Sequence, residues 1–161
     1  MLNSLTKRAG LLIILSIFIL SIFIRLPLLN RPLSNHHEWL TSLSLRMVTI
    51  LYDNGAPEYN FSPITTYGGD ANKNIDNTAT VFMPEDSKGD YYYVSHLPFA
   101  YIFPYFIFKI INIQPSVLGL QIINLVFHFV ASYLIYLIII LLFGKTKGIN
   151  WPAIIGFTVY T

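Results

Sequence analysis

Two long apolar stretches constrain this chain more than any other feature of its sequence. Residues 11–24 are apolar apart from two serines, and residues 117–143 contain no Asp, Glu, Lys or Arg. A helix needs about 20 mainly apolar residues to cross the hydrocarbon core of a bilayer, which is about 30 Å thick. The sequence therefore predicts an all-α integral membrane protein, built as a polytopic helical bundle.

The composition supports this class and excludes several others. Of the 161 residues, 54% are hydrophobic and only 11% are charged, whereas soluble domains carry about 25% charged residues. The net charge of +2 comes from scattered basic residues, so the chain offers no basic stripe for a nucleic acid partner. The absence of cysteine excludes disulfides, Cys-ligated zinc and a cysteine nucleophile.

The apolar segments divide the chain into membrane spans and one long polar loop. Spans are expected at about 11–29, 97–113 and 117–143, with the start of a fourth at 151–161. Because a helix does not end unsatisfied inside hydrocarbon, we expect the chain to be the N-terminal part of a longer protein. A cleaved signal peptide is the rival interpretation of the first span, but no small-residue cleavage site follows that span.

Basic residues next to the spans set the expected orientation. Lys7 and Arg8 precede the first span and favour a cytoplasmic N-terminus, which makes residues 30–96 a large extracytoplasmic first loop. Three crossings then place Lys145 and Lys147 outside, against the tendency of basic loops to stay inside. In this arrangement the two pairs of basic residues pull in opposite directions.

The loop begins with a predicted amphipathic helix and ends in turn-rich sequence. Asn35 can cap the helix, with Glu38 as its reciprocal partner three residues later. We expect this helix to lie along the membrane surface, anchored by Trp39. Its apolar face is formed by Leu40, Leu43, Met47 and Leu51. The acidic residues of the turn-rich half need no role beyond solvation: Asp70, Asp76, Asp86 and Asp90.

The third expected span carries a stripe of polar side chains. Its members recur at spacings of three and four residues and so share one helical face: Gln121, Asn124, His128, Ser132 and Tyr136. Polar side chains do not face lipid cheaply, so the stripe must face other helices or a wet cavity. Hydrogen bonding between helices explains it, and so does a pathway or ligand-binding face; both interpretations stay open here.

Glu38 is the candidate general base of the chain. It lies about ten residues beyond the first span, close to the boundary where a lipid-linked substrate presents its head group. An ionised carboxylate at that boundary can deprotonate a substrate hydroxyl within hydrogen-bond reach. The structural alternative is that Glu38 only completes the helix cap.

Three further residues are candidates for binding a substrate: His37, His96 and Arg25. A histidine can donate a hydrogen bond to a phosphate or a sugar hydroxyl. Arg25, at the exit of the first span, can either snorkel to head groups or pair with a lipid phosphate. A divalent metal stays open as a cofactor, although adjacent helical histidines such as His36 and His37 diverge by about 100° and no H-E-x-x-H motif occurs.

The layout resembles the N-terminal part of a GT-C type membrane glycosyltransferase, of the protein O-mannosyltransferase and aminoarabinose transferase kind (glycosyltransferase family 39-like). The first span ends in an Arg-x-Pro-like exit at residues 24–27 (IRLP), and the acidic Glu38 follows early in the large loop. A His-Pro-Pro-Leu-like entry to the second span stands at residues 96–99 (HLPF). Many members carry an Asp-Glu pair where this chain has His37-Glu38; if that Asp is the base in them, the role here falls to Glu38 or is lost.

The resemblance implies sugar transfer from a polyprenyl-phosphate donor to an acceptor on the extracytoplasmic side. Its partners would be that lipid-linked sugar and membrane lipid, in a multi-pass protein of the inner membrane if the source is bacterial. The 161 residues alone would be inactive. The competing hypotheses are a non-enzymatic transporter or lipid flippase that uses the polar stripe, and a polymerase or ligase of surface polysaccharide, which would more often place its large loop late.

Overall fold

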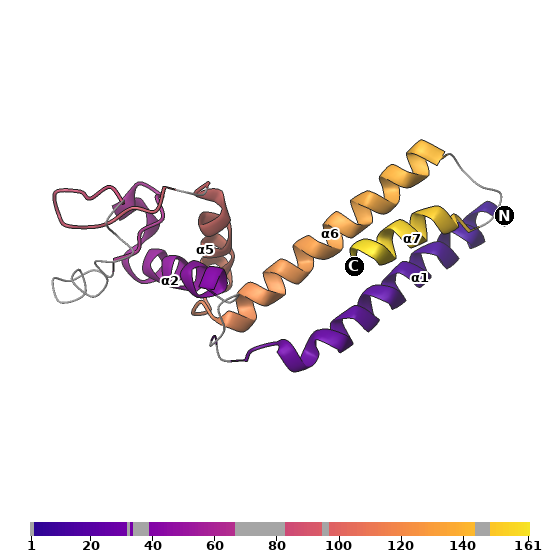
Figure 1. Ribbon diagram of the computed structural model, residues 1–161, viewed down its shortest axis with the longest axis horizontal. Helices are drawn as coiled ribbons and strands as arrows, with labels where there is room; N and C mark the ends of the chain where they lie inside the picture. The colour runs from indigo at the N-terminus through magenta and orange to yellow at the C-terminus, as the bar shows by residue number, and fades with distance from the viewer. Residues whose placement is uncertain (1, 32, 34–38, 67–82, 95–96, 144–148) are drawn as a thin grey trace. The chain divides into compact units, whose positions relative to one another are not determined.

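The computed structural model describes the chain except for residues 1, 32, 34–38, 67–82, 95–96 and 144–148 (Figure 1). The fold is mostly helical, at 72%, and the described residues contain no strand. The α-helices are α1 (Leu2–Arg25), α2 (Trp39–Asn54), α5 (Phe99–Ile111), α6 (Val117–Phe143) and α7 (Trp151–Tyr160), with 3-10 helices η1 (Leu26–Leu28) and η3 (Ala56–Tyr59). The all-α prediction is confirmed at this level.

The chain divides into two compact units, each described by itself below. The first unit, called the hairpin unit, comprises Met1–Arg31 and Gln121–Thr161, and therefore holds α1, most of α6, and α7. The second unit, called the loop unit, comprises Pro32–Leu120 and holds α2, η3 and α5. Most of the loop unit is the segment that the sequence identifies as the large polar loop.

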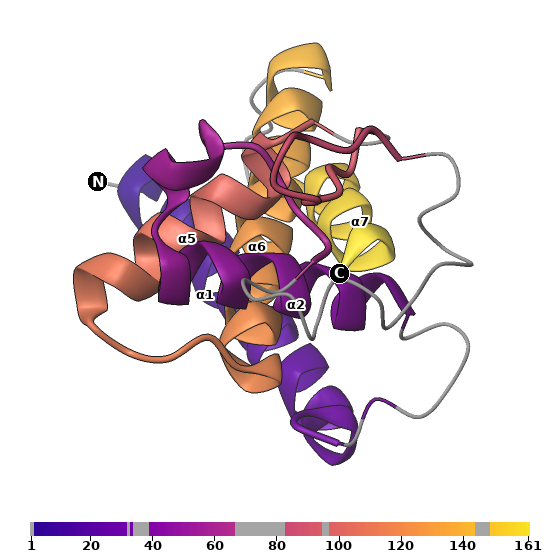
Figure 2. The same cartoon turned by 90° about the vertical axis from the view of Figure 1, so that its left-hand side faces the viewer.

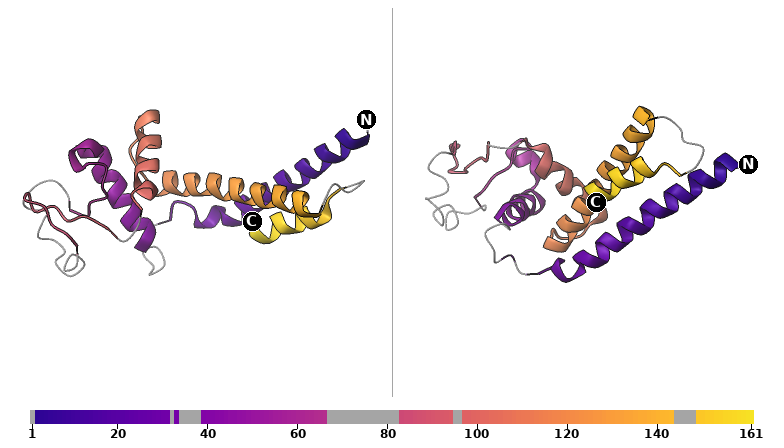
Figure 3. Two further views of the ribbon diagram at one scale, coloured as in Figure 1. Left: turned by 90° about the horizontal axis from the view of Figure 1, so that it is seen from above. Right: turned by 45° about the vertical axis from the view of Figure 1, so that its right-hand side comes forward.

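In the hairpin unit, α1 and α6 run antiparallel. Near the start of α1, a Cβ atom added to Gly10 would lie 3.1 Å from the hydroxyl of Tyr136, late in α6. At the other end of α1, Arg25 reaches His128, in the first half of α6. The short α7 lies beside α1 (Figure 1, Figure 3), and Ile14, Ile154 and Phe157 form the buried core of the unit. This pairing places the end of α1 next to the beginning of α6.

α1 and α6 are long and apolar enough to cross a membrane. The candidate spans are Arg8–Leu28, with 21 residues, and Val117–Leu142, with 26 residues. In each, only 6% of the most apolar window is buried, whereas the core helix of a soluble protein buries most of its apolar surface. Both helices therefore present apolar side chains outward along their length, as a lipid-facing helix does.

In the loop unit, α2 packs against α5 (Figure 2). The buried residues of α2 are Met47, Val48, Ile50 and Leu51. Only part of the predicted apolar face is thus buried, since Leu40 is 57% exposed. The predicted cap by Asn35 and Glu38 lies outside the described residues.

α5 is shorter than the segment 97–113 that the sequence marks as a span. It has 13 residues, which is about 20 Å of helix. Its end is fixed by Asn112, which adopts a left-handed backbone (φ 53°) and donates its N–H to the carbonyls of Lys109 and Phe108. A residue in this conformation ends a helix while satisfying its last carbonyl groups.

Candidate ligand-binding site in the hairpin unit

The polar stripe of α6 faces inward at several positions. Ser132 is fully buried and donates a hydrogen bond to the carbonyl of His128 at 2.8 Å. Gln121 accepts a hydrogen bond at 2.9 Å from the backbone N–H of Asn30, which follows η1. His128 stacks on Tyr160 of α7, with ring centroids 5.3 Å apart. The stripe therefore meets the end of α1 and the end of α7, in agreement with the expectation that it faces protein or a cavity.

Arg25 brings a positive charge to this stripe. It occupies the last turn of α1, where the carbonyl ends of the helix favour a cation. Its Nη2 donates to the carbonyl oxygen of Thr161 at 2.6 Å and lies 3.5 Å from Nε2 of His128. His128 Nε2 is also 3.1 Å from the same carbonyl oxygen.

These residues line a cavity of about 280 Å³. Its walls come from the end of α1 and from the first turns of α6: Arg25, Leu29, Gln121, Asn124, Leu125 and His128. Arg25, Gln121 and His128 are half-buried, while Asn124 is exposed. The cavity thus combines one fixed cation, amide groups and an imidazole with two leucine side chains.

This combination suits an anionic group attached to an apolar body. A guanidinium carries five N–H donors in a planar fork and binds phosphate or carboxylate through two parallel hydrogen bonds. Nη2 of Arg25 contacts Thr161 and His128, and the Arg25 side chain lines the cavity. Gln121, Asn124 and His128 add further polar groups, and the leucines add apolar surface.

Of the four site residues predicted from sequence, the structure places Arg25 alone. Glu38, His37 and His96 lie outside the described residues, as does His36. The structure therefore brings Arg25 together with the polar stripe, which sequence reasoning had treated as two separate features. A contact between residues 25 and 128 joins segments 103 positions apart, so no local pattern could reveal it.

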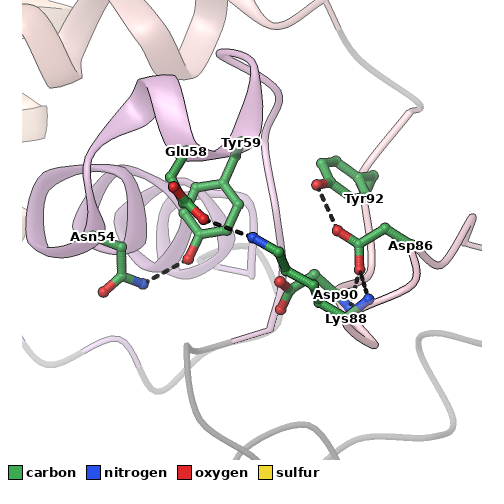
Figure 4. A network of polar contacts seen from close by, with 7 residues as sticks. All are labelled: Asn54, Glu58, Tyr59, Asp86, Lys88, Asp90 and Tyr92. Carbon is green, nitrogen blue, oxygen red and sulfur yellow. Dashed lines mark hydrogen bonds and ion pairs between the residues drawn. The ribbon is translucent and has the colours of Figure 1, made fainter.

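A second polar network organises the loop unit (Figure 4). Asp86 accepts hydrogen bonds from the backbone N–H groups of Lys88 and Asp90 through Oδ1, and from the Tyr92 hydroxyl through Oδ2. Asp90 is 5% exposed and accepts from the buried hydroxyl of Thr66 at 3.0 Å. Asp86 and Asp90 therefore shape this turn, which corrects the expectation that they only solvate it.

Charges in this network shift the ionisation of its members. Lys88 pairs with Glu58 at 2.7 Å, and this hydrogen bond and charge lower the pKa of Glu58. Both side chains are largely exposed, so the pair holds the turn near η3 with little stability of its own. Burial, followed by the hydrogen bond to Asp86, raises the pKa of Tyr92 from 10.0 to about 12.

Metal-binding geometry does not appear in the described residues, where no three His, Asp or Glu side chains gather. Comparison of the chain with protein-family profiles, curated proteins and solved structures finds no match.

Proposed function

We propose that this chain belongs to a membrane glycosyltransferase of GT-C type. The donor would be a polyprenyl-phosphate-linked sugar, bound on the extracytoplasmic side. The observation that carries the proposal is the cavity where Arg25 meets Gln121, Asn124 and His128, at one end of two helices of membrane length. The resemblance of the segments at 24–27, 38 and 96–99 to that family adds to it.

The donor's chemistry matches the site. Its tail needs lipid-facing apolar surface, and its phosphate needs a cation with oriented N–H groups at the edge of the hydrocarbon. Arg25 ends an apolar helix of 24 residues, which is where that edge would fall. As the sugar leaves, negative charge grows on the phosphate oxygens, and a fixed guanidinium stabilises this charge without having to reorganise.

Glu38 is proposed as the general base. Its carboxylate takes the proton of the acceptor hydroxyl, whose oxygen forms a bond to the anomeric carbon of the sugar. The bond between that carbon and the phosphate oxygen breaks, and polyprenyl phosphate leaves with the electron pair. His37 and His96 are proposed to donate hydrogen bonds to the sugar or the phosphate. This transfer accounts for every proton and electron pair without a divalent metal.

A second candidate function is a non-enzymatic lipid flippase or transporter. It is favoured by the fact that Asn124 and His128 line the cavity directly. In that case the polar face of α6 carries the head group, and Glu38 plays no chemical part. The two functions therefore differ in which residue is indispensable.

The test uses the full-length protein in proteoliposomes with a polyprenyl-phosphate-linked sugar. For a transferase, we expect Glu38→Gln to abolish sugar transfer while binding of polyprenyl phosphate alone is retained. The matched control is Glu58→Gln, an exposed carboxylate of the loop unit. Transfer that survives in Glu38→Gln would refute the assigned base. Lipid head-group movement without transfer, lost in His128→Ala, would establish the flippase instead.

A further inference from the structure

α5 is apolar apart from Lys109 and buries only one of its faces. Its buried face is Tyr101, Pro104, Tyr105 and Phe108. On the opposite face, Phe99, Phe106 and Ile110 are 64%, 44% and 81% exposed. Their spacings of seven and four residues align them in one stripe along the helix. An exposed stripe of this kind calls for an apolar partner.

Phe61 extends this stripe from outside the helix. Its ring stacks on that of Phe106, with centroids 6.2 Å apart, and it is 39% exposed. Its backbone is left-handed, with φ at 57°, a conformation that bulky residues rarely adopt. Two aromatic rings are thus held side by side at the surface of the loop unit.

The hairpin unit limits how the intervening chain can cross a membrane. The backbone N–H of Asn30 and the side-chain oxygen of Gln121 are 2.9 Å apart. Residues 30 and 121 therefore lie at the same membrane face if α1 and α6 cross the membrane. A chain that leaves and returns to one face crosses an even number of times.

Between these two residues, the described part of the chain contains one further apolar helix outside the candidate spans, α5. A single crossing by α5 would separate residues 30 and 121 by the full hydrocarbon thickness of about 30 Å. With 13 residues, α5 also reaches only about 20 Å.

We propose that α5 does not cross the membrane but lies in its outer interface, with Phe99, Phe106, Ile110 and Phe61 in contact with lipid. This replaces the crossing expected at 97–113, and it rests on α1 and α6 crossing as proposed above, not on the transfer reaction. α5 ends at Ile111 and α6 begins at Val117, so five residues tether its end to a span. Interfacial helices bury one apolar face about 5–10 Å into the boundary between head groups and acyl chains.

The proposal also removes a conflict in the charges. With two crossings before residue 144, Lys145 and Lys147 fall on the same side as Lys7 and Arg8. All four basic residues then follow the preference of basic segments for the cytoplasm. With α5 as a span, the two pairs oppose each other.

The first experiment determines sides by cysteine labelling in the full chain, which has no native cysteine. Ser87→Cys and Gln114→Cys flank α5, and a membrane-impermeant maleimide is applied to right-side-out vesicles. We expect both to be labelled from outside, and Lys147→Cys to be labelled only after the vesicles are opened. Labelling of Ser87→Cys and Gln114→Cys from opposite sides would overturn the proposal. Ile113→Cys repeats the measurement if Gln114→Cys fails to insert.

The second experiment measures depth with spin labels in vesicles of phosphatidylcholine and phosphatidylglycerol. Labels at Phe99→Cys, Phe106→Cys and Ile110→Cys should report one shared shallow depth, while Leu134→Cys in α6 reports a deep position. A helix that crosses would instead separate positions 99 and 110 by about 16 Å along the membrane normal, and that result would refute the inference. Depths equal to that of Ser87→Cys, in water, would refute it as well. Neither readout depends on sugar transfer.

Discussion

Arg25 is the residue on which the candidate site depends. Its guanidinium ties the end of α1 to α7 through the carbonyl of Thr161 and to α6 through His128. A bond at 2.6 Å from a charged donor is stronger than a neutral hydrogen bond. The same side chain lines the cavity and supplies its positive charge. Replacing Arg25 should therefore weaken ligand binding.

Arg25→Gln should weaken binding of polyprenyl phosphate by about 10- to 100-fold, since hydrogen bonds to charged groups contribute about 1.5–3 kcal/mol. Arg25→Lys keeps the charge but loses the planar fork, so we expect an intermediate affinity. The measurement is equilibrium binding of the lipid to the reconstituted protein at several salt concentrations. Arg31→Gln, an exposed arginine outside the cavity, is the control. Equal affinities of the Arg25→Gln variant and the unaltered chain for the lipid would show that its phosphate does not bind in this cavity.

The raised pKa of Tyr92 makes the stability of the loop unit depend on pH under alkaline conditions. Its pKa is raised to about 12 in the fold, above the ordinary value of about 10. The folded state therefore keeps this proton where the unfolded state releases it, so the contribution to stability is complete below pH 10 and is lost as pH rises toward 12. Tyrosinate absorbance of the chain minus that of Tyr92→Phe should show one phenol ionising near pH 12.

Asp86→Asn is the companion variant for this titration. It removes the negative charge that the Tyr92 hydroxyl faces at 3.0 Å. The ionisation of the Tyr92 phenol should therefore move to lower pH. A difference titration centred at the ordinary tyrosine value in the unaltered chain would show that burial and Asp86 do not hold this proton.

At the level of elements, Gly119 permits the first turn of α6 to approach α5. A Cβ atom at this position would lie 2.5 Å from Cε1 of Phe108, whose ring is 2% exposed. Gly119→Ala should therefore destabilise the loop unit by about 1–3 kcal/mol through overpacking, offset by about 1 kcal/mol of helix propensity. Thermal unfolding of the purified full chain measures the net loss.

A double-mutant cycle separates the contact from the propensity. Phe108→Leu makes room for the new methyl group, so Gly119→Ala should cost less in that background than alone. Additive effects of the two substitutions would mean that the ring does not limit how closely the two helices pack.

The positions of the long helices could be predicted from sequence, whereas the residues that these helices contact could not. α6 begins and ends with the apolar run from Val117 to Phe143, because length and apolarity are local properties. The inward stripe was also predictable from spacing. What it meets was not, since Arg25 and Asn30 approach it from about a hundred positions away. α5 lies within the predicted segment 97–113 and ends two residues early, at the left-handed turn of Asn112.

At the scale of the whole molecule, the bond between Asn30 and Gln121 brings together the two ends of a segment of about ninety residues. Both ends lie at one membrane face if α1 and α6 cross as proposed. Glu38 and His96 both belong to this segment. If α1 and α6 cross the membrane and α5 does not, as proposed, the proposed base and the proposed phosphate site lie on one side of the membrane.

The basic residues at the far end of that hairpin should then act together on orientation. We expect removal of Lys7 and Arg8 charge, as Lys7→Gln with Arg8→Gln, to lower the fraction of chains whose Ser87→Cys is labelled from outside. Adding Lys145→Gln and Lys147→Gln should lower it further, because all four charges favour the cytoplasmic side. If α5 crossed the membrane, the second pair would oppose the first, and its removal would raise the outside-labelled fraction. The direction of this one change therefore reports the number of crossings in the chain.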